Sequence, residues 1–197
     1  LGIRTSIYHA IPGEPDGYTI DHSLPAMQHI AASGLIDYLS LMGGSNANFA
    51  ESVPPMTLPR PQITYLSAKF KQALDIPIIV AGRIVTPEEA EAVLVNEQAD
   101  IVGLARAFIA DPDWMNKAES GQTDRIRLCT GCNQACLGFA GRSLPGGCNF
   151  NPEAGREDEL SPLMPALKKK HIAVVGGGPA GLECARAVAE RGHAVTL

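Results

Sequence analysis

The sequence predicts an α/β protein with a parallel sheet, followed by a cysteine-rich segment and a second α/β unit. Short β-branched runs alternate with helical periodicity through about the first 110 residues, which is typical of successive strand–helix units. A stretch with four cysteines and no regular period follows, and a glycine-rich turn then comes directly after a new strand. These three observations define the predicted fold class.

The composition excludes several kinds of protein. The chain of 197 residues is 45% hydrophobic and 19% charged, which is ordinary for a folded globular protein. Its 16 Lys and Arg against 21 Asp and Glu leave no excess positive charge, so we expect no nucleic-acid partner. No apolar run approaches the roughly 20 residues of a membrane span, so we expect no membrane partner and a cytoplasmic location.

The first part contains four expected strands, with amphipathic helices between them. The strands are expected over residues 2–7, 36–42, 76–81 and 100–105. The third helix has the best-defined start, because Thr86 is a suitable N-cap, Pro87 suits the first turn and Glu89 completes a capping box. A fourth helix is expected from Asp111 to Gly121.

The cysteines of the middle segment follow the spacing C-x2-C-x3-C-x11-C, formed by Cys129, Cys132, Cys136 and Cys148. Disulfides are disfavoured because the rest of the sequence has the pattern of an intracellular α/β protein, so metal ligation is the better interpretation. Three clustered thiols and one remote thiol favour a 4Fe–4S cluster. A zinc site and unmetallated thiols are the alternatives.

The glycine-rich turn has the pattern G-x-G-x-x-G at Gly176, Gly178 and Gly181, with Pro179 and Ala180 inside it. A β-branched strand precedes it and an amphipathic helix follows, which is the context of a dinucleotide-binding turn. Gly178 would admit a pyrophosphate to the backbone at the start of the helix. The acidic residue that would contact the ribose falls beyond Leu197, so the sequence does not choose the dinucleotide.

Two further turns place small residues and an arginine after expected strands, at Gly82-Arg83 and at Ala105-Arg106. In (β/α)8 barrels the loops after strands seven and eight commonly bind phosphate, and arginine suits a phosphate dianion. Arg4 lies inside the first expected strand, where a charge must face the barrel mouth or be paired.

Together these motifs resemble the NADH:flavin oxidoreductases of the old yellow enzyme group. The similarity is to the large members with an iron–sulfur centre, the 2,4-dienoyl-CoA reductase and trimethylamine dehydrogenase types. It covers essentially the whole chain and rests on four stretches, AGRIVTPEEA, ARAFIADP, CTGCNQACLG and VVGGGPAGLECA.

The resemblance implies three segments. Residues 1–120 would be the C-terminal half of an FMN-binding TIM barrel, with strands five to eight. Residues 121–165 would be the 4Fe–4S segment and linker, and residues 166–197 the start of a Rossmann-like domain for FAD or NAD(P). Arg4 would lie near the flavin ring, and Gly82, Arg83, Ala105 and Arg106 would form the FMN phosphate pocket.

The implied activity passes electrons from NAD(P)H through FAD and the cluster to FMN, which reduces an activated C=C bond of a small molecule. The reductase type has three residues between its second and third cysteines, as here, and the loop 43–48 lacks the acidic residue of the amine dehydrogenase type. An amine dehydrogenase or N-demethylase with the same cofactors is the alternative. A zinc-binding scaffold without activity leaves the phosphate and dinucleotide turns unexplained.

We expect the chain to be a middle segment of a longer protein that can form homo-oligomers. The resemblance places the catalytic proton donor and the substrate-anchoring pair upstream of residue 1, so the segment alone is expected to be inactive.

Overall fold

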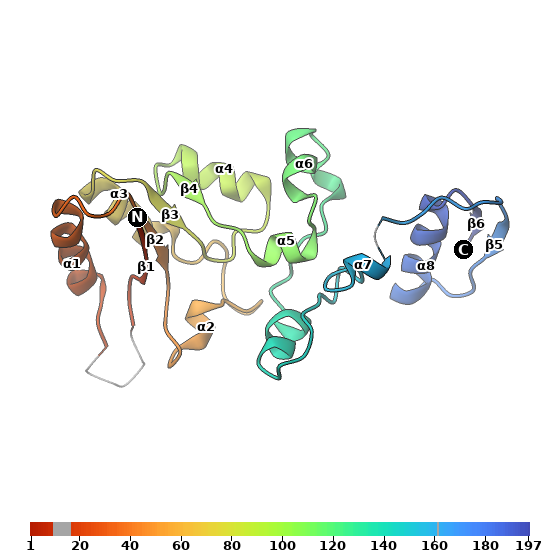
Figure 1. The fold of residues 1–197 in the computed structure, drawn as a ribbon, viewed down its shortest axis with the longest axis horizontal. Coiled ribbons are helices and arrows are strands. Elements are labelled where there is room, and N and C mark those ends of the chain that lie inside the picture. Colours follow the sequence, from red (N-terminus) through yellow and green to blue (C-terminus); the bar gives the residue numbers. More distant parts are fainter. Residues whose placement is uncertain (10–16, 161) are drawn as a thin grey trace. The chain divides into compact units, whose positions relative to one another are not determined.

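The computed structural model describes residues 1–9, 17–160 and 162–197. The chain divides into two compact units, Leu1–Asn151 and Pro152–Leu197, which are described separately (Figure 1). The cysteine-rich segment belongs to the first unit. The finer domain boundaries expected near residues 120 and 165 stay predictions.

The first unit is built on a four-stranded parallel sheet in the order β1-β2-β3-β4, which confirms the predicted class. The strands are β1 Gly2–Ser6, β2 Tyr38–Met42, β3 Ile78–Val80 and β4 Ile101–Val102. The expectation that the fourth strand reaches Ala105 was wrong. Ala105 has helical dihedral angles and precedes a short helix, so the chain has already turned away from the sheet.

Helices connect and follow these strands. They are α1 Ile20–Ala32, α2 Phe49–Ser52, α3 Thr64–Ala73, α4 Pro87–Val95, α5 Arg106–Ala110 and α6 Trp114–Glu119. Helix α5 was not predicted, and α6 begins three residues later than expected. The delay has a local cause: the carboxylate and carbonyl of Asp111 accept the amides of Asp113 and Trp114 and hold a turn before the helix.

The predicted capping box of α4 is present. Thr86 Oγ1 accepts the amide of Glu89 at 3.2 Å, and Glu89 Oε2 accepts the amide of Thr86 at 3.2 Å. The same carboxylate accepts the Val85 amide at 2.8 Å. The end of β3 therefore passes into α4 through a fixed turn, and this fixes the backbone that leads from Gly82 and Arg83.

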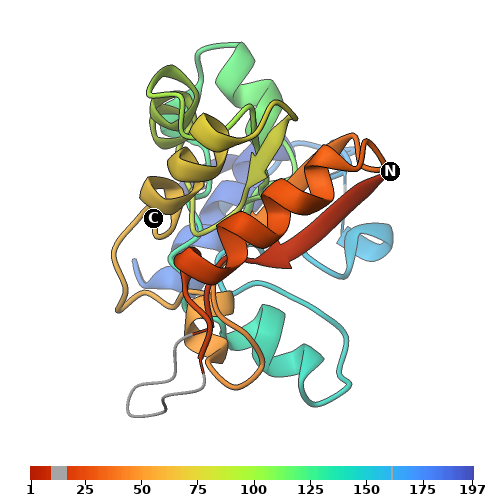
Figure 2. The same cartoon turned by 90° about the vertical axis from the view of Figure 1, so that its left-hand side faces the viewer.

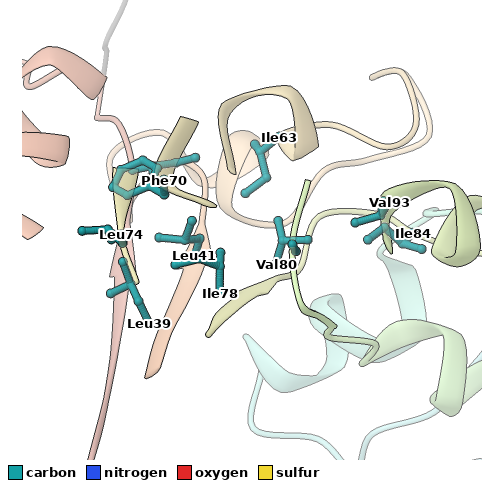
Figure 3. Packing of buried hydrophobic residues seen from close by; sticks show 11 residues of the cluster. Leu39, Leu41, Ile63, Phe70, Leu74, Ile78, Val80, Ile84 and Val93 are labelled. Atoms are coloured by element: carbon teal, nitrogen blue, oxygen red, sulfur yellow. The ribbon is translucent and has the colours of Figure 1, made fainter. Parts of the chain in front are cut away.

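The core lies between the sheet and its helices. Leu39, Leu41, Ile78 and Val80 from the strands pack with Phe70 of α3 (Figure 3). Helices α1 and α3 contact each other, and Figure 2 shows them side by side. The four strand residues of this cluster are fully buried, so packing fixes β2 and β3 where their loops leave the sheet.

The cysteine-rich segment follows α6. After a 3-10 turn, Thr123–Arg125, the chain continues in loops around a π-helical turn, Gln134–Gly138, which carries Cys136. Trp114 in α6 is 3% exposed and its indole donates to the carbonyl of Val85 at 2.8 Å. The start of the segment is therefore attached to the turn after β3.

The second unit contains one strand–helix–strand crossover. Helix α7 Glu157–Leu160 precedes β5 His171–Ala173, α8 Pro179–Glu190 and β6 Ala194–Thr196, and β5 pairs with β6 in parallel. The side chain of Arg186 on α8 is paired with Glu183 and Glu190. No helix in the described parts of the chain is long and apolar enough to span a bilayer.

Candidate functional site

A cleft of about 310 Å³ lies at the carboxyl ends of the strands of the first unit. Parallel strands direct their carboxyl ends to one edge, and this edge is where open and closed α/β sheets bind ligands. The cleft is lined by all five residues that the sequence assigned to a flavin site: Arg4, Gly82, Arg83, Ala105 and Arg106. The structure therefore brings together residues that are up to about a hundred positions apart in the sequence.

Arg83 follows β3 with a left-handed backbone, φ +55°. Its Nη1 donates to the carbonyl of Leu58, and its Nη2 donates to the carbonyl of Thr130 at 3.4 Å. Burial lowers the pKa of Arg83, and the like charges of Arg60 and Arg106 lower it further. Arg83 and Arg106 both line the cleft, and two neighbouring cations favour an anionic ligand.

Arg106, the first residue of α5, also reaches across the cleft. Its Nη1 donates to the carbonyl of Pro54 at 2.8 Å and to Asn133 Oδ1 at 2.5 Å. Both acceptors lie outside the strands of the sheet, one on the loop after α2 and one in the cysteine segment. Arg106 therefore connects three parts of the first unit, a role that its position in the sequence did not indicate.

The cleft has unused hydrogen-bonding capacity that fits a phosphate. Within the described residues, Ser52 Oγ and Arg83 Nε are buried polar atoms without a partner, and both residues line the cleft. A Cβ at Gly82 would lie 3.1 Å from the Ile63 side chain, so a larger residue would crowd the wall there. Two arginines and a residue with an unpartnered hydroxyl, all of which line one cleft, fit a phosphate ligand.

The four cysteines Cys129, Cys132, Cys136 and Cys148 line one small cavity of about 20 Å³. None of them forms a disulfide in the structure. Burial raises the pKa of the Cys129 thiol, and the nearby Cys136 and Cys148 raise it further. The Gly131 amide and Arg106 lower this pKa, but they do not outweigh burial. The fold therefore gathers four thiols that the sequence spreads over about twenty residues.

The cavity of the four cysteines adjoins the larger cleft. Across residues 1–9, 17–160 and 162–197, no three Cys, His, Asp or Glu side chains are placed so that they could hold a single metal ion. Arg106, Ile109, Cys129 and Cys136 line both this cavity and the larger cleft. The cysteine cavity and the cleft are thus neighbours that share side chains.

The glycine turn in the second unit has the backbone that its pattern predicts. Gly176 has φ +108°, Gly178 caps α8 and Pro179 begins it. A Cβ at Gly181 would lie 1.8 Å from the carbonyl oxygen of Gly176, so only glycine fits there. The turn and Ala180 present the first amides of a twelve-residue helix, the arrangement that binds a pyrophosphate in dinucleotide domains.

Sequence reasoning missed several residues of this region. Asn133 and Ser52 were not identified. The sequence around Ser52 carries no signal of a site, and the one signal at Asn133 is that asparagine tolerates the left-handed backbone seen there. Also missed was a cluster behind the cleft wall, in which the Glu51 carboxylate accepts from Tyr8 Oη at 2.5 Å and from Gln62 Nε2. Burial and this carboxylate raise the pKa of Tyr8.

Comparison with known proteins agrees with this fold. Residues 16–125 match the model of the NADH:flavin oxidoreductase / NADH oxidase family. The chain belongs to that family. Its homologues are named as reductases, oxidases and dehydrogenases.

Relatives from two functional groups are similar to the chain. It is 42% identical to the metal reductase of Desulforamulus reducens over 93% of its length and 36% identical to the N,N-dimethylglycine/sarcosine dehydrogenase of Chromohalobacter salexigens, also over 93%. A solved 2-naphthoyl-CoA reductase complex superimposes with a TM-score of 0.88 at 32% identity over 96% of the chain. The chain spans 27% of each of the first two proteins and 28% of the third.

Proposed function

We propose that this chain supplies half of an FMN-binding barrel, an iron–sulfur segment and the start of a dinucleotide-binding domain to an NAD(P)H-dependent oxidoreductase. The main support for this proposal is that five residues line one cleft: Arg4, Gly82, Arg83, Ala105 and Arg106. That cleft shares Arg106 and two cysteines with the cavity of the four thiols. Two redox cofactors would then lie in adjacent sites.

The cleft would hold FMN through its charges. Arg83 and Arg106 would bind the phosphate together with Ser52, whose hydroxyl has no other partner in the described structure. Arg4 is exposed on β1 and lines the same cleft, where its positive charge would favour the anionic reduced flavin ring. When bound, FMN supplies the hydride chemistry, and these residues supply orientation and charge.

The cysteine cavity would hold a 4Fe–4S cluster. Zinc sites with four cysteine ligands more often use two separated C-x2-C pairs. Here the four thiols line one cavity, and their spacing of three clustered cysteines and one remote cysteine favours a 4Fe–4S cluster. In the second unit, Gly176, Gly178 and Gly181 would contact the pyrophosphate of FAD or NAD(P). The complete cofactor set would carry electrons from NAD(P)H through FAD and the cluster to FMN.

We infer that the substrate is a small molecule with an activated C=C bond, of the dienoyl-CoA or enone type. The loop after β2 offers no carboxylate from Gly43 to Asn48, and the nearest one, Glu51, is hydrogen-bonded to Tyr8 and Gln62. A substituted amine would therefore find no uncommitted acidic partner in this loop. Amine dehydrogenation or N-demethylation is the second candidate, because the dimethylglycine/sarcosine dehydrogenase is similar over 93% of the chain.

The test uses the full-length protein, purified without oxygen. We expect FMN, FAD, iron and acid-labile sulfide, flavin bleaching by NADH or NADPH, and reoxidation by an enone or enoyl-CoA. Bleaching by dimethylglycine or another N-methylated amine, with no reoxidation by enones, would favour the second candidate. Zinc in place of iron and sulfide would refute the electron pathway.

A matched pair of variants tests the phosphate assignment. Arg106→Ala is expected to lose bound FMN, because it removes a cation that lines the cleft. Arg142→Ala removes an exposed arginine elsewhere in the first unit and is expected to keep its flavin. Full flavin content in Arg106→Ala would show that the assignment is wrong.

A further inference from the structure

The loop that forms one wall of the cleft is held by the cysteine segment. Ser52, Val53 and Pro54 line the cleft at the end of α2. The carbonyl of Val53 accepts from Asn133 Nδ2 at 3.0 Å, and the carbonyl of Pro54 accepts from Arg106 at 2.8 Å. The position of this wall therefore depends on a residue next to Cys132.

Asn133 is suited to this bridging role by its backbone as well as its side chain. It has φ +58° and ψ +14°, a left-handed conformation that turns the chain between Cys132 and the π-helical turn with Cys136. Its amide group is used on both sides, since Nδ2 donates to Val53 and Oδ1 accepts from Arg106 at 2.5 Å. One side chain thus contacts the cleft wall and a cleft arginine at once.

We propose that Asn133 is a positioning residue that couples occupancy of the cysteine site to FMN affinity. The inference rests on the function proposed above. The conformation of the turn 129–136 depends on whether its thiols are ligated, because three of the four cysteines lie on it. A change in that turn moves Asn133, and Arg106 and Val53 then lose their shared partner at the flavin cleft.

The coupling is reciprocal by thermodynamic necessity. A cluster that holds Asn133 in place improves FMN binding, and bound FMN that orders Arg106 and the wall stabilises the ligated turn by the same factor. Two other contacts join the turn to the wall, the Met56 amide to the Gly131 carbonyl at 2.9 Å and Arg83 to the Thr130 carbonyl. They involve only backbone atoms of the turn, so they remain in a variant that loses the Asn133 side chain.

Asn133→Gly isolates the side chain. Glycine adopts the left-handed backbone without strain, so the variant removes both hydrogen bonds and keeps the turn. Glu97→Gly is the matched control, because Glu97 is an exposed residue with φ +53° at the end of α4, away from the cleft lining. Asn133→Asp is a second variant that keeps an acceptor for Arg106 and removes the donor to Val53.

The experiment is a thermodynamic cycle on the full-length protein. The dissociation constant of FMN is measured by flavin fluorescence before and after iron removal with a chelator, for the wild type and each variant. We expect iron removal to weaken FMN binding about tenfold in the wild type and in Glu97→Gly, a typical size for such coupling. In Asn133→Gly, FMN binding is already several-fold weaker with iron present. Iron removal then weakens it by a clearly smaller factor than in the wild type, about threefold, because the Met56 and Arg83 contacts still join the turn to the wall. Asn133→Asp is expected between these limits.

The outcomes separate this inference from the proposed function. Wild-type protein without FMN or without iron contradicts the proposed function and the coupling together. If the wild-type protein holds both cofactors, but iron removal weakens FMN binding equally in wild type and Asn133→Gly, the coupling alone is overturned. Unchanged FMN affinity in iron-loaded Asn133→Gly overturns it as well.

Discussion

Asp111 is a buried carboxylate at the end of α5, and its removal tests how the cysteine segment is anchored. It is 1% exposed and accepts from Lys117 Nζ at 2.6 Å, from the Arg127 amide at 2.8 Å and from the Asp113 amide at 3.1 Å. Arg127 lies two residues before Cys129. Asp111 therefore holds the chain at the entrance to the four-thiol cavity.

Asp111→Asn preserves size but turns an acceptor into a donor that faces Lys117 and the Arg127 amide. Breaking a fully buried ion pair costs about 3–5 kcal/mol. Lys117 is 24% exposed and water can solvate it in part, and Asn keeps one acceptor for the Asp113 amide. We therefore expect local destabilisation by about 2–3 kcal/mol, which is about a 30- to 150-fold loss of amide protection.

Hydrogen exchange of peptides covering residues 111–128, measured in the full-length protein, reports this value. Asp113→Asn is the matched control, since Asp113 is exposed, and it should change protection by less than about 0.5 kcal/mol. Wild-type protection of residues 111–128 in Asp111→Asn would refute the reasoning, because the carboxylate would then not hold the segment.

The same carboxylate predicts a pH dependence. Burial alone would raise the pKa of Asp111, but Lys117 and the amides of Arg127 and Asp113 outweigh it and lower the pKa below its ordinary value of 3.8. A lowered folded-state pKa stabilises the fold above the ordinary value, and this contribution is lost as the pH falls through the folded value. The difference between wild type and Asp111→Asn should therefore be constant near neutral pH and shrink below about pH 4. A difference that persists unchanged into that range would contradict the assignment.

Three further changes have defined expected outcomes. Thr86→Ala removes the acceptor for the Glu89 amide and should destabilise α4 by about 1 kcal/mol, measured by hydrogen exchange of that helix. Gly131→Ala places a Cβ 3.0 Å from Arg83 Nε at a residue with φ +75°, so the substitution should destabilise the turn by about 1–2 kcal/mol and weaken FMN binding. Unchanged FMN affinity would argue against contact between the turn and the cleft. Cys148→Ser should retain less than about half the wild-type iron, measured by metal analysis, whereas Cys184→Ser, at an exposed cysteine outside the cavity, should retain it all.

Several features could be predicted because they follow from local physical chemistry. The alternation of β-branched runs and helical stripes predicted the parallel sheet β1-β2-β3-β4, since apolar periodicity records which residues must be buried. The capping box at Thr86 and Glu89 and the glycine-rich turn at Gly176 needed only neighbouring residues. Strand ends were less predictable, because the residues after β4 can extend the sheet or enter α5 at similar local cost.

The sequence by itself determined the order of the strands, the spacing of the four cysteines and the set of cationic and glycine residues expected around a phosphate. Only the tertiary structure decided that Arg106 donates to the carbonyl of Pro54 and to the side-chain oxygen of Asn133, residues 52 and 27 positions away. It likewise decided that Asp111 holds the Arg127 amide. The physical reason is that these polar contacts connect segments distant in the sequence. A buried polar group must be hydrogen-bonded, and its partner is the donor or acceptor that the packed fold places beside it.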